Sequence, residues 1–173
     1  MSLKSILTVT AFGAAVLVAG ASSAQQPNPL DTVPDKMPFD IPYGAPISLE
    51  RADAVLAAAL AESKKRDWKL ICSVVDSGGH LVSFKRMDNA QIASIDIANH
   101  KARAAAKFRR ETKLFENAIQ TYHYVGTLDD VIASRGGIPL VEAGKLVGAI
   151  GCSGGTGSQD EVIAKTGAAL VNK

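Results

Sequence analysis

The sequence lacks two short motifs that often mark metal-dependent or thiol-dependent enzymes. There is no His-Glu-x-x-His pair and no Cys-x-x-Cys pair. The chain also lacks a large excess of charge of either sign, since it has 17 Asp and Glu and 19 Lys and Arg. This balance argues against nucleic acid or a strongly anionic membrane as a partner, because both attract a basic excess. These absences favour a binding protein over an enzyme.

Long apolar runs are scarce, and the one that stands out lies at the N-terminus. Lys4 supplies a positive start, residues 6–18 are almost entirely apolar or small, and small residues precede Ala24. The run is shorter than the roughly 20 residues that a membrane-spanning helix needs. The pattern predicts a signal peptide over residues 1–24, cleaved after Ala24, and a periplasmic or secreted protein with no stable membrane insertion.

Cysteine is rare, with Cys72 and Cys152 as the two examples in the chain. Both fall in predicted strands, so a disulfide requires that those strands be neighbours with matching side-chain geometry. The alternative is a pair of buried thiols that never meet. The sequence leaves this choice open.

Proline is concentrated in one stretch, because six of the seven prolines lie in residues 25–46. Proline fixes φ and removes a backbone donor, so we expect an extended N-terminal segment that serves as a tether or as an arm of an oligomer. The folded domain is expected over residues 47–173.

The apolar pattern of that domain predicts helices alternating with two β-hairpins. The expected order is a helix capped by Ser48, strands at 70–75 and 81–84, helices at 91–108 and 113–119, a helical turn at 128–133, strands at 138–141 and 146–150, and a helix at 158–171. Both strand pairs are tight hairpins, so the sheet should be mainly antiparallel with helices packed on it. The fold class is therefore α/β, of the α+β kind.

A glycine-rich loop precedes the last helix and is one candidate ligand site. Glycines allow close approach of a ligand, and free amides at a helix start favour an anion or a carboxylate. The alternative is a sharp strand-to-helix turn with Ser158 as the helix cap, and the two interpretations have equal support. The residues of this candidate site are Ser153, Gly154, Gly155, Thr156 and Gly157.

Asp96 and His100 form a second candidate site, because residues four apart share one face of a helix. A carboxylate can orient an imidazole for base catalysis or for iron ligation. A solvated ion pair is the simpler alternative. His123, flanked by Tyr122 and Tyr124, offers another imidazole, or an ordinary aromatic loop anchor.

Several sequence blocks resemble the GlcG/HbpS-like family and occur in that family's order. They are the hairpin at residues 75–88, the helix blocks 94–98 and 101–105, and residues 136–139, 147–154 and 159–161. The resemblance extends from about residue 47 to the C-terminus. It implies a profilin-like domain with an antiparallel sheet of about five strands, and a homo-oligomer.

The resemblance also implies haem or another tetrapyrrole as the ligand, although no family ligand position matches a residue of this chain. We expect a macrocycle in an apolar groove, with its propionates met by Lys101, Arg103 or Arg110. His100 or His123 is the expected axial ligand. The competing hypothesis is a small enzyme or accessory protein that holds an organic acid at the glycine-rich loop, with Asp96 and His100 as acid and base.

Overall fold

The computed structural model describes residues 32–37 and 39–172. The chain divides into two units, Met1–Lys36 and Met37–Lys173, and every described helix and strand lies in the second. The predicted signal peptide and its cleavage site lie outside the described residues. No helix within the described part of the chain is both long enough and apolar enough to cross a bilayer.

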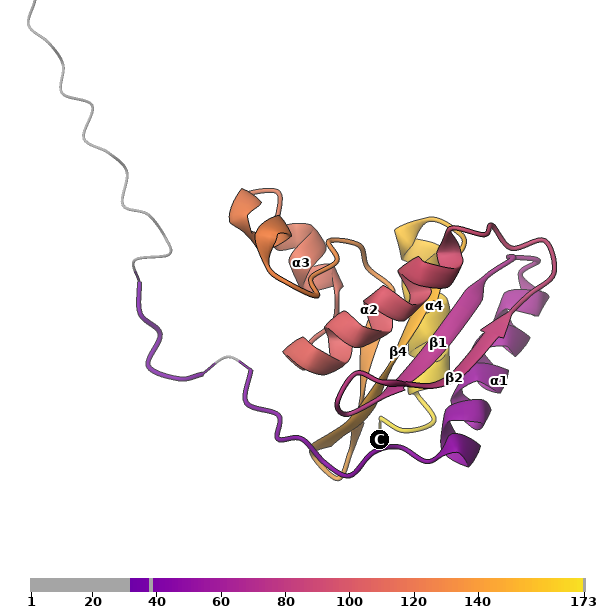
Figure 1. Cartoon of the computed structure of the whole chain (residues 1–173), viewed down its shortest axis with the longest axis horizontal. Coiled ribbons are helices and arrows are strands. Elements are labelled where there is room, and N and C mark those ends of the chain that lie inside the picture. The colour runs from indigo at the N-terminus through magenta and orange to yellow at the C-terminus, as the bar shows by residue number, and fades with distance from the viewer. Residues whose placement is uncertain (1–31, 38, 173) are drawn as a thin grey trace, which may run out of the picture. The chain divides into compact units, whose positions relative to one another are not determined.

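The second unit is a four-stranded antiparallel sheet with strand order β2-β1-β4-β3 (Figure 1). This confirms the predicted fold class, with four strands in the described residues where about five were expected. In chain order the elements are α1 (Leu49–Lys65), β1 (Ile71–Asp76), β2 (Leu81–Arg86), α2 (Ser94–Phe108), α3 (Lys113–Ala118), the 3₁₀-helix η2 (His123–Thr127), β3 (Gly137–Glu142), β4 (Lys145–Ser153) and α4 (Gly157–Ala168).

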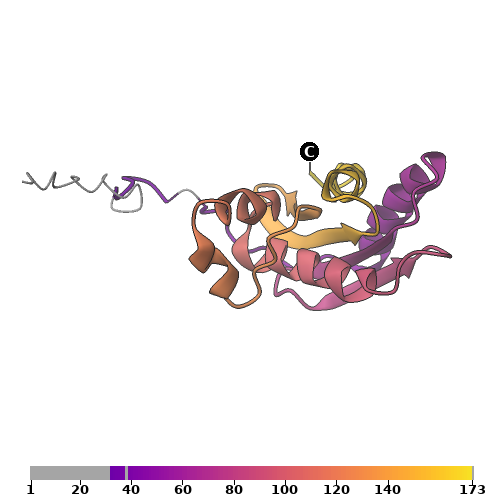
Figure 2. The same ribbon diagram turned by 90° about the horizontal axis from the view of Figure 1, so that it is seen from above.

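Helices cover both faces of the sheet, α1 and α4 on one side and α2 on the other (Figure 2). Successive side chains of a strand point to opposite faces. Cys72 and Val74 of β1 therefore pack in the core under α1 and α4, whereas Ile71 and Val75 pack toward α2. Both faces of β1 are buried, which explains its nearly continuous apolar sequence.

Small residues on α2 allow this helix to lie almost in contact with the backbone of β4. A Cβ at Gly151 would lie 2.2 Å from the carbonyl oxygen of Ala98 and 2.4 Å from the amide nitrogen of Ala102. Glycine is therefore required at this point of the strand, and alanine on the helix opposite it. This close approach fixes which face of α2 is exposed.

Several predicted bounds differ from the structure, mostly by a few residues. β4 continues through Ser153, because residues 151–153 remain paired with β1. The last helix is capped by Thr156 and not by Ser158. The helical turn expected at 128–133 is wrong, and the turn lies instead at His123–Thr127.

Cys72 and Cys152 form a disulfide, which settles the choice that the sequence left open. The two residues face each other on the neighbouring strands β1 and β4, with their Cα atoms 4.2 Å apart. The bond joins positions 80 residues apart in the chain. It ties the first hairpin to the second at the centre of the sheet.

The described end of the proline-rich segment packs along the start of β4. Gly44 and Ile47 donate backbone hydrogen bonds to Leu146 and Val147, and the Leu146 amide donates to the Pro42 carbonyl. Tyr43 also donates its hydroxyl to the Lys107 carbonyl, 2.8 Å away. Residues 42–47 therefore belong structurally to the folded unit.

Candidate functional site

Three adjoining depressions lie along the exposed face of α2, and we call them together the α2 groove. The first lies beside Tyr43, the second between the turn at residues 77–81 and Lys107, and the third at His100 and Asp130. Each depression shares lining residues with the next. α2 thus presents its small residues to the sheet and its polar face to this groove.

Asp96, His100 and Arg103 line the same depression at one end of the groove. The structure therefore brings together three of the predicted site residues, as their helical spacing requires. The carboxylate of Asp96 and the imidazole of His100 are not within 4.0 Å of each other in the described structure. The predicted pairing of these two side chains is therefore absent, and the imidazole is not fixed by a carboxylate.

Asp130 joins the cationic side chains of the groove. Its carboxylate accepts a hydrogen bond from Arg103 at 2.6 Å and another from Lys107. The hydrogen bond from Lys107, together with the nearby charges of Arg103 and His100, lowers the pKa of Asp130 below its usual value. Asp130 lies in an irregular segment distant in sequence from α2, so no local pattern predicted its place here.

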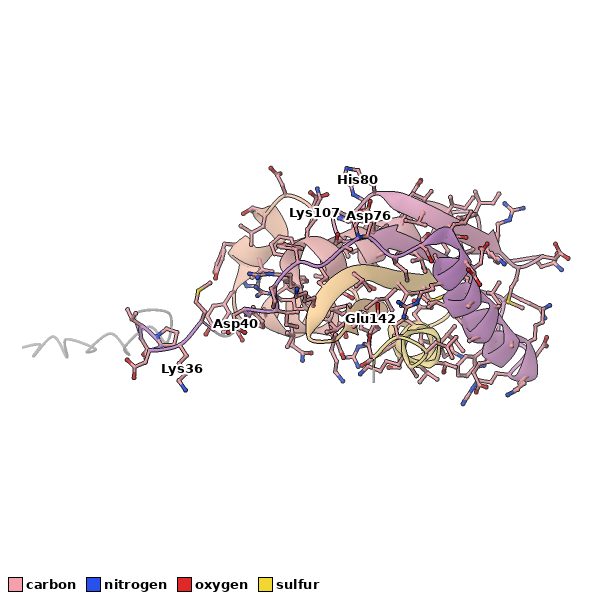
Figure 3. All side chains as sticks on the ribbon, turned by 90° about the horizontal axis from the view of Figure 1, so that it is seen from below. Lys36, Asp40, Asp76, His80, Lys107 and Glu142 are labelled. Atoms are coloured by element: carbon pink, nitrogen blue, oxygen red, sulfur yellow. A yellow bond between two sulfur atoms is a disulfide. The ribbon has the colours of Figure 1, made fainter. Side chains whose placement is uncertain are left out.

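The turn between β1 and β2 places a further imidazole on the rim of the groove (Figure 3). Asp76 Oδ1 accepts the backbone amides of Gly78 and His80, at 2.8 and 2.9 Å. The same oxygen lies 3.4 Å from Nδ1 of His80, whose side chain is 84% exposed. His80 is thus a turn residue, and its imidazole also borders the groove.

Asn99 lines two of the adjoining depressions. Its side-chain oxygen is buried and has no hydrogen-bond partner among the described atoms. A buried polar atom without a partner is costly.

Lys101 does not lie in the groove, contrary to the expectation that it meets a propionate. Its side chain is 1% exposed, and Nζ donates to Asp160 Oδ2 at 2.7 Å and to the Cys152 carbonyl at 3.2 Å. Two residues from Arg103, it faces the opposite side of α2. Its ammonium stabilises the core and is unavailable to a surface ligand.

Arg110 and His123 are also separate from the α2 groove. The guanidinium of Arg110 stacks on Phe39 and lies near Phe108 and Phe115, and burial among these rings lowers its pKa. His123 is exposed on η2 and lines none of the three depressions. Of the predicted haem contacts, the structure therefore places Asp96, His100 and Arg103 in one site.

The glycine-rich loop uses most of its amides within the chain. The Gly155 amide donates to Asp160, the Thr156 amide to the side chain of Gln159, and the Gln159 amide to the Thr156 hydroxyl. The last two bonds form a capping box at the start of α4. Ser153 is buried and bonds to Ser94, so the arrangement favours a strand-to-helix turn over an anion site.

No metal-binding cluster is present in residues 32–37 and 39–172, where no three His, Cys, Asp or Glu side chains are grouped.

Residues 47–169 match the family described as haem degrading protein HbpS-like. The chain belongs to the HbpS-like family. The resemblance read from the sequence is thereby confirmed. Among family relatives, protein GlcG of Escherichia coli (strain K12) is 38% identical over 108 residues, which cover 62% of this chain and 81% of GlcG.

Solved structures in the HbpS-like family share the fold. A double mutant of HbpS from Streptomyces reticuli matches with a TM-score of 0.71 at 25% identity, over 81% of this chain and all of that one (100%). The PduOC:heme complex matches with a TM-score of 0.67 at 26% identity, over 74% of this chain and 96% of that one. That relative is a haem complex by its description.

Proposed function

We propose that this chain is an exported haem-binding protein that holds the macrocycle along the α2 groove. The observation that carries the proposal is the meeting of His100 and Arg103 in one depression of the groove. His100 supplies an imidazole for the iron, and bound haem then contributes the iron and its Soret absorption. A role in haem sensing, storage or protection follows from binding outside the cytoplasm.

The groove residues are chemically suited to haem. Arg103 uses one of its guanidinium nitrogens on Asp130, so further N–H donors remain for a propionate. Lys107 lies on the next turn of α2 and adds a second cation to the same groove. Tyr43 and Leu81 supply apolar surface for the ring.

Two further findings support the proposal. The family description names haem, and one relative of known structure is a haem complex. The disulfide between Cys72 and Cys152 supports export, because stable disulfides are characteristic of oxidising compartments. We also propose that the chain self-associates, as the family resemblance implies.

A hemin titration of the mature chain, residues 25–173, tests this proposal. We expect a saturable Soret band, and we expect His100→Ala to weaken binding at least about tenfold, because the imidazole ligand is lost. Arg103→Gln should weaken binding by a smaller factor. Absorbance at the Soret maximum gives the dissociation constant of each variant.

His123→Ala is the matched control, since it removes an exposed imidazole that lies outside the groove. Its dissociation constant should equal that of the unsubstituted chain. Absence of a saturable Soret band would contradict haem binding itself. Equal losses in His100→Ala and His123→Ala would contradict the α2 groove as the site.

A further inference from the structure

A second pocket, distinct from the α2 groove, lies at the opposite end of the sheet. It is bounded by the end of α1 (Leu60, Lys64), by Lys69 before β1 and by Arg86–Asn89 after β2. Its volume is about 400 Å³. The α2 groove borders the turn at residues 77–81, where the same two strands meet at their other ends. We call this second site the α1–β2 pocket.

Positive charge dominates the α1–β2 pocket. Lys64, Lys69 and Arg86 come from three different segments, and Asp88 is the one carboxylate in the lining. Lys69 is paired with Asp67, which lies outside the lining. Charges of one sign gathered in a concave site raise the local concentration of ligands of the opposite sign.

Arg86 is distinctive among the arginines in the described residues. The guanidiniums of the others contact a carboxylate, as in Arg51, Arg66, Arg103 and Arg135, or an aromatic ring, as in Arg109 and Arg110. Arg86 has neither kind of partner in that part of the chain, and Lys64 likewise has no carboxylate within 4.0 Å. The fork of N–H donors on Arg86 is therefore free to bind a carboxylate through two parallel hydrogen bonds.

The pocket also offers apolar contact. Leu60 and Met87 are half-buried in its lining. A neighbouring depression shares Lys69 and Asn89 with it and continues to Trp68. A ligand held by Arg86 would thus meet hydrocarbon as well as charge, which suits an organic acid better than an inorganic ion.

We propose that the α1–β2 pocket binds a small organic carboxylate, with Arg86 as the principal anchor and Lys64 as a supporting cation. This site differs in place and in chemistry from the haem groove. It also gives a role to Arg86, Met87 and Asp88, which end the hairpin block of the sequence and contribute nothing to the α2 groove.

The proposal is tested by titrating the mature chain with succinate at low salt while following tryptophan fluorescence. Trp68 is the single tryptophan, and it lies in the adjoining depression. We expect a saturable change in emission that weakens in 0.5 M sodium chloride, because salt screens the exposed charges. Arg86→Gln should raise the dissociation constant at least about tenfold, since a charge-assisted bidentate contact is lost.

Lys145→Gln is the matched control, because this exposed lysine also lacks a described carboxylate partner but lies on the distant β3–β4 hairpin. It should leave succinate binding unchanged. Calorimetry repeats the titration in case the emission of Trp68 is insensitive. No saturable binding by either method, or equal affinity in Arg86→Gln, would overturn the proposal.

Inorganic phosphate is titrated in parallel to test the ligand class. Binding of phosphate without binding of succinate would overturn the assignment to carboxylates. Hemin binding is measured on the same Arg86→Gln protein and should be unchanged. The failure of this proposal can therefore be distinguished from the failure of the haem proposal.

Discussion

At the scale of single residues, the buried pair of Lys101 and Asp160 is the most consequential interaction. The ammonium and the carboxylate lie 2.7 Å apart, with side chains 1% and 4% exposed. Asp160 also accepts the Gly155 amide, so one carboxylate connects α2, α4 and the loop after β4. A buried pair of this kind is costly to break, because the remaining charge has no solvent.

Replacing Lys101 by Met should therefore destabilise the fold by about 3–5 kcal/mol, since Asp160 would be left buried without its partner. Urea unfolding of the variant and the parent chain measures the difference. The double variant Lys101→Met/Asp160→Leu should recover part of the loss, because it removes both charges. Lys145→Met is the exposed control, and a loss in Lys101→Met no larger than in this control would contradict the structural role.

Residue identity alone did not separate the roles of neighbouring cations on α2. Lys101 and Arg103 are two positions apart, and both were expected to meet a propionate. An α-helix has 3.6 residues per turn, so two side chains that are two positions apart point to nearly opposite sides of it. The packing of α2 on β4 decides which of the two is exposed. Arg103 thus remains a candidate ligand contact and Lys101 does not.

At the scale of elements, the capping box of α4 favours a structural role for the glycine-rich loop. Thr156 and Gln159 exchange hydrogen bonds that satisfy two amides at the start of this helix. Gly154, at φ +144°, adopts a backbone conformation that favours glycine and lies against the backbone of Leu70. The loop therefore serves to bring the chain from β4 into α4.

Removing the cap should lower stability without affecting hemin binding. We expect Thr156→Ala to cost about 1 kcal/mol, since its hydroxyl no longer accepts the Gln159 amide. Thermal and urea unfolding measure the change. Thr166→Ala, within the same helix, is the control and should cost less. If Thr156→Ala changed the free energy of hemin binding by more than it changed the free energy of unfolding, the loop would contribute to a ligand site.

At the scale of the whole molecule, the edge strand β2 has apolar residues that α2 leaves uncovered. Phe84 lies opposite Ser73 of β1, on the face of the sheet that α2 covers elsewhere, and its side chain remains 37% exposed. Exposed apolar surface on an edge strand is a typical place for a second chain to bind. We propose that this strand contributes to the self-association of the chain.

Light scattering of the mature chain tests this proposal. The parent protein should have a mass that is a multiple of the monomer's, and Phe84→Glu should shift it toward the monomer, because a charge is costly in a buried interface. Leu170→Glu is the matched control. Leu170 lies just after the end of α4 and is also partly exposed. A monomeric parent protein, or equal masses for both variants and the parent, would contradict the role of β2.

Local sequence patterns were enough to predict the order of the main helices and strands, the antiparallel hairpins and the family. These properties depend on local patterns, namely apolar periodicity, turn residues and blocks of adjacent residues. Such patterns involve residues that are close together in the sequence. The spacing of Asp96 and His100 likewise predicted a shared helix face. The disulfide stayed open, because its formation depends on which strands become neighbours.

Which of the predicted residues meet became clear from the packing of the folded chain. It placed Asp130 beside Arg103, buried Lys101 against Asp160 and separated Arg110 and His123 from the groove. These outcomes depend on how α2 packs on β4 and on the path of the segment after η2, both set by contacts between residues far apart in sequence. The packing of α1 against β1 and β2 brought Lys64, Lys69 and Arg86 together in the α1–β2 pocket, which no local pattern indicated.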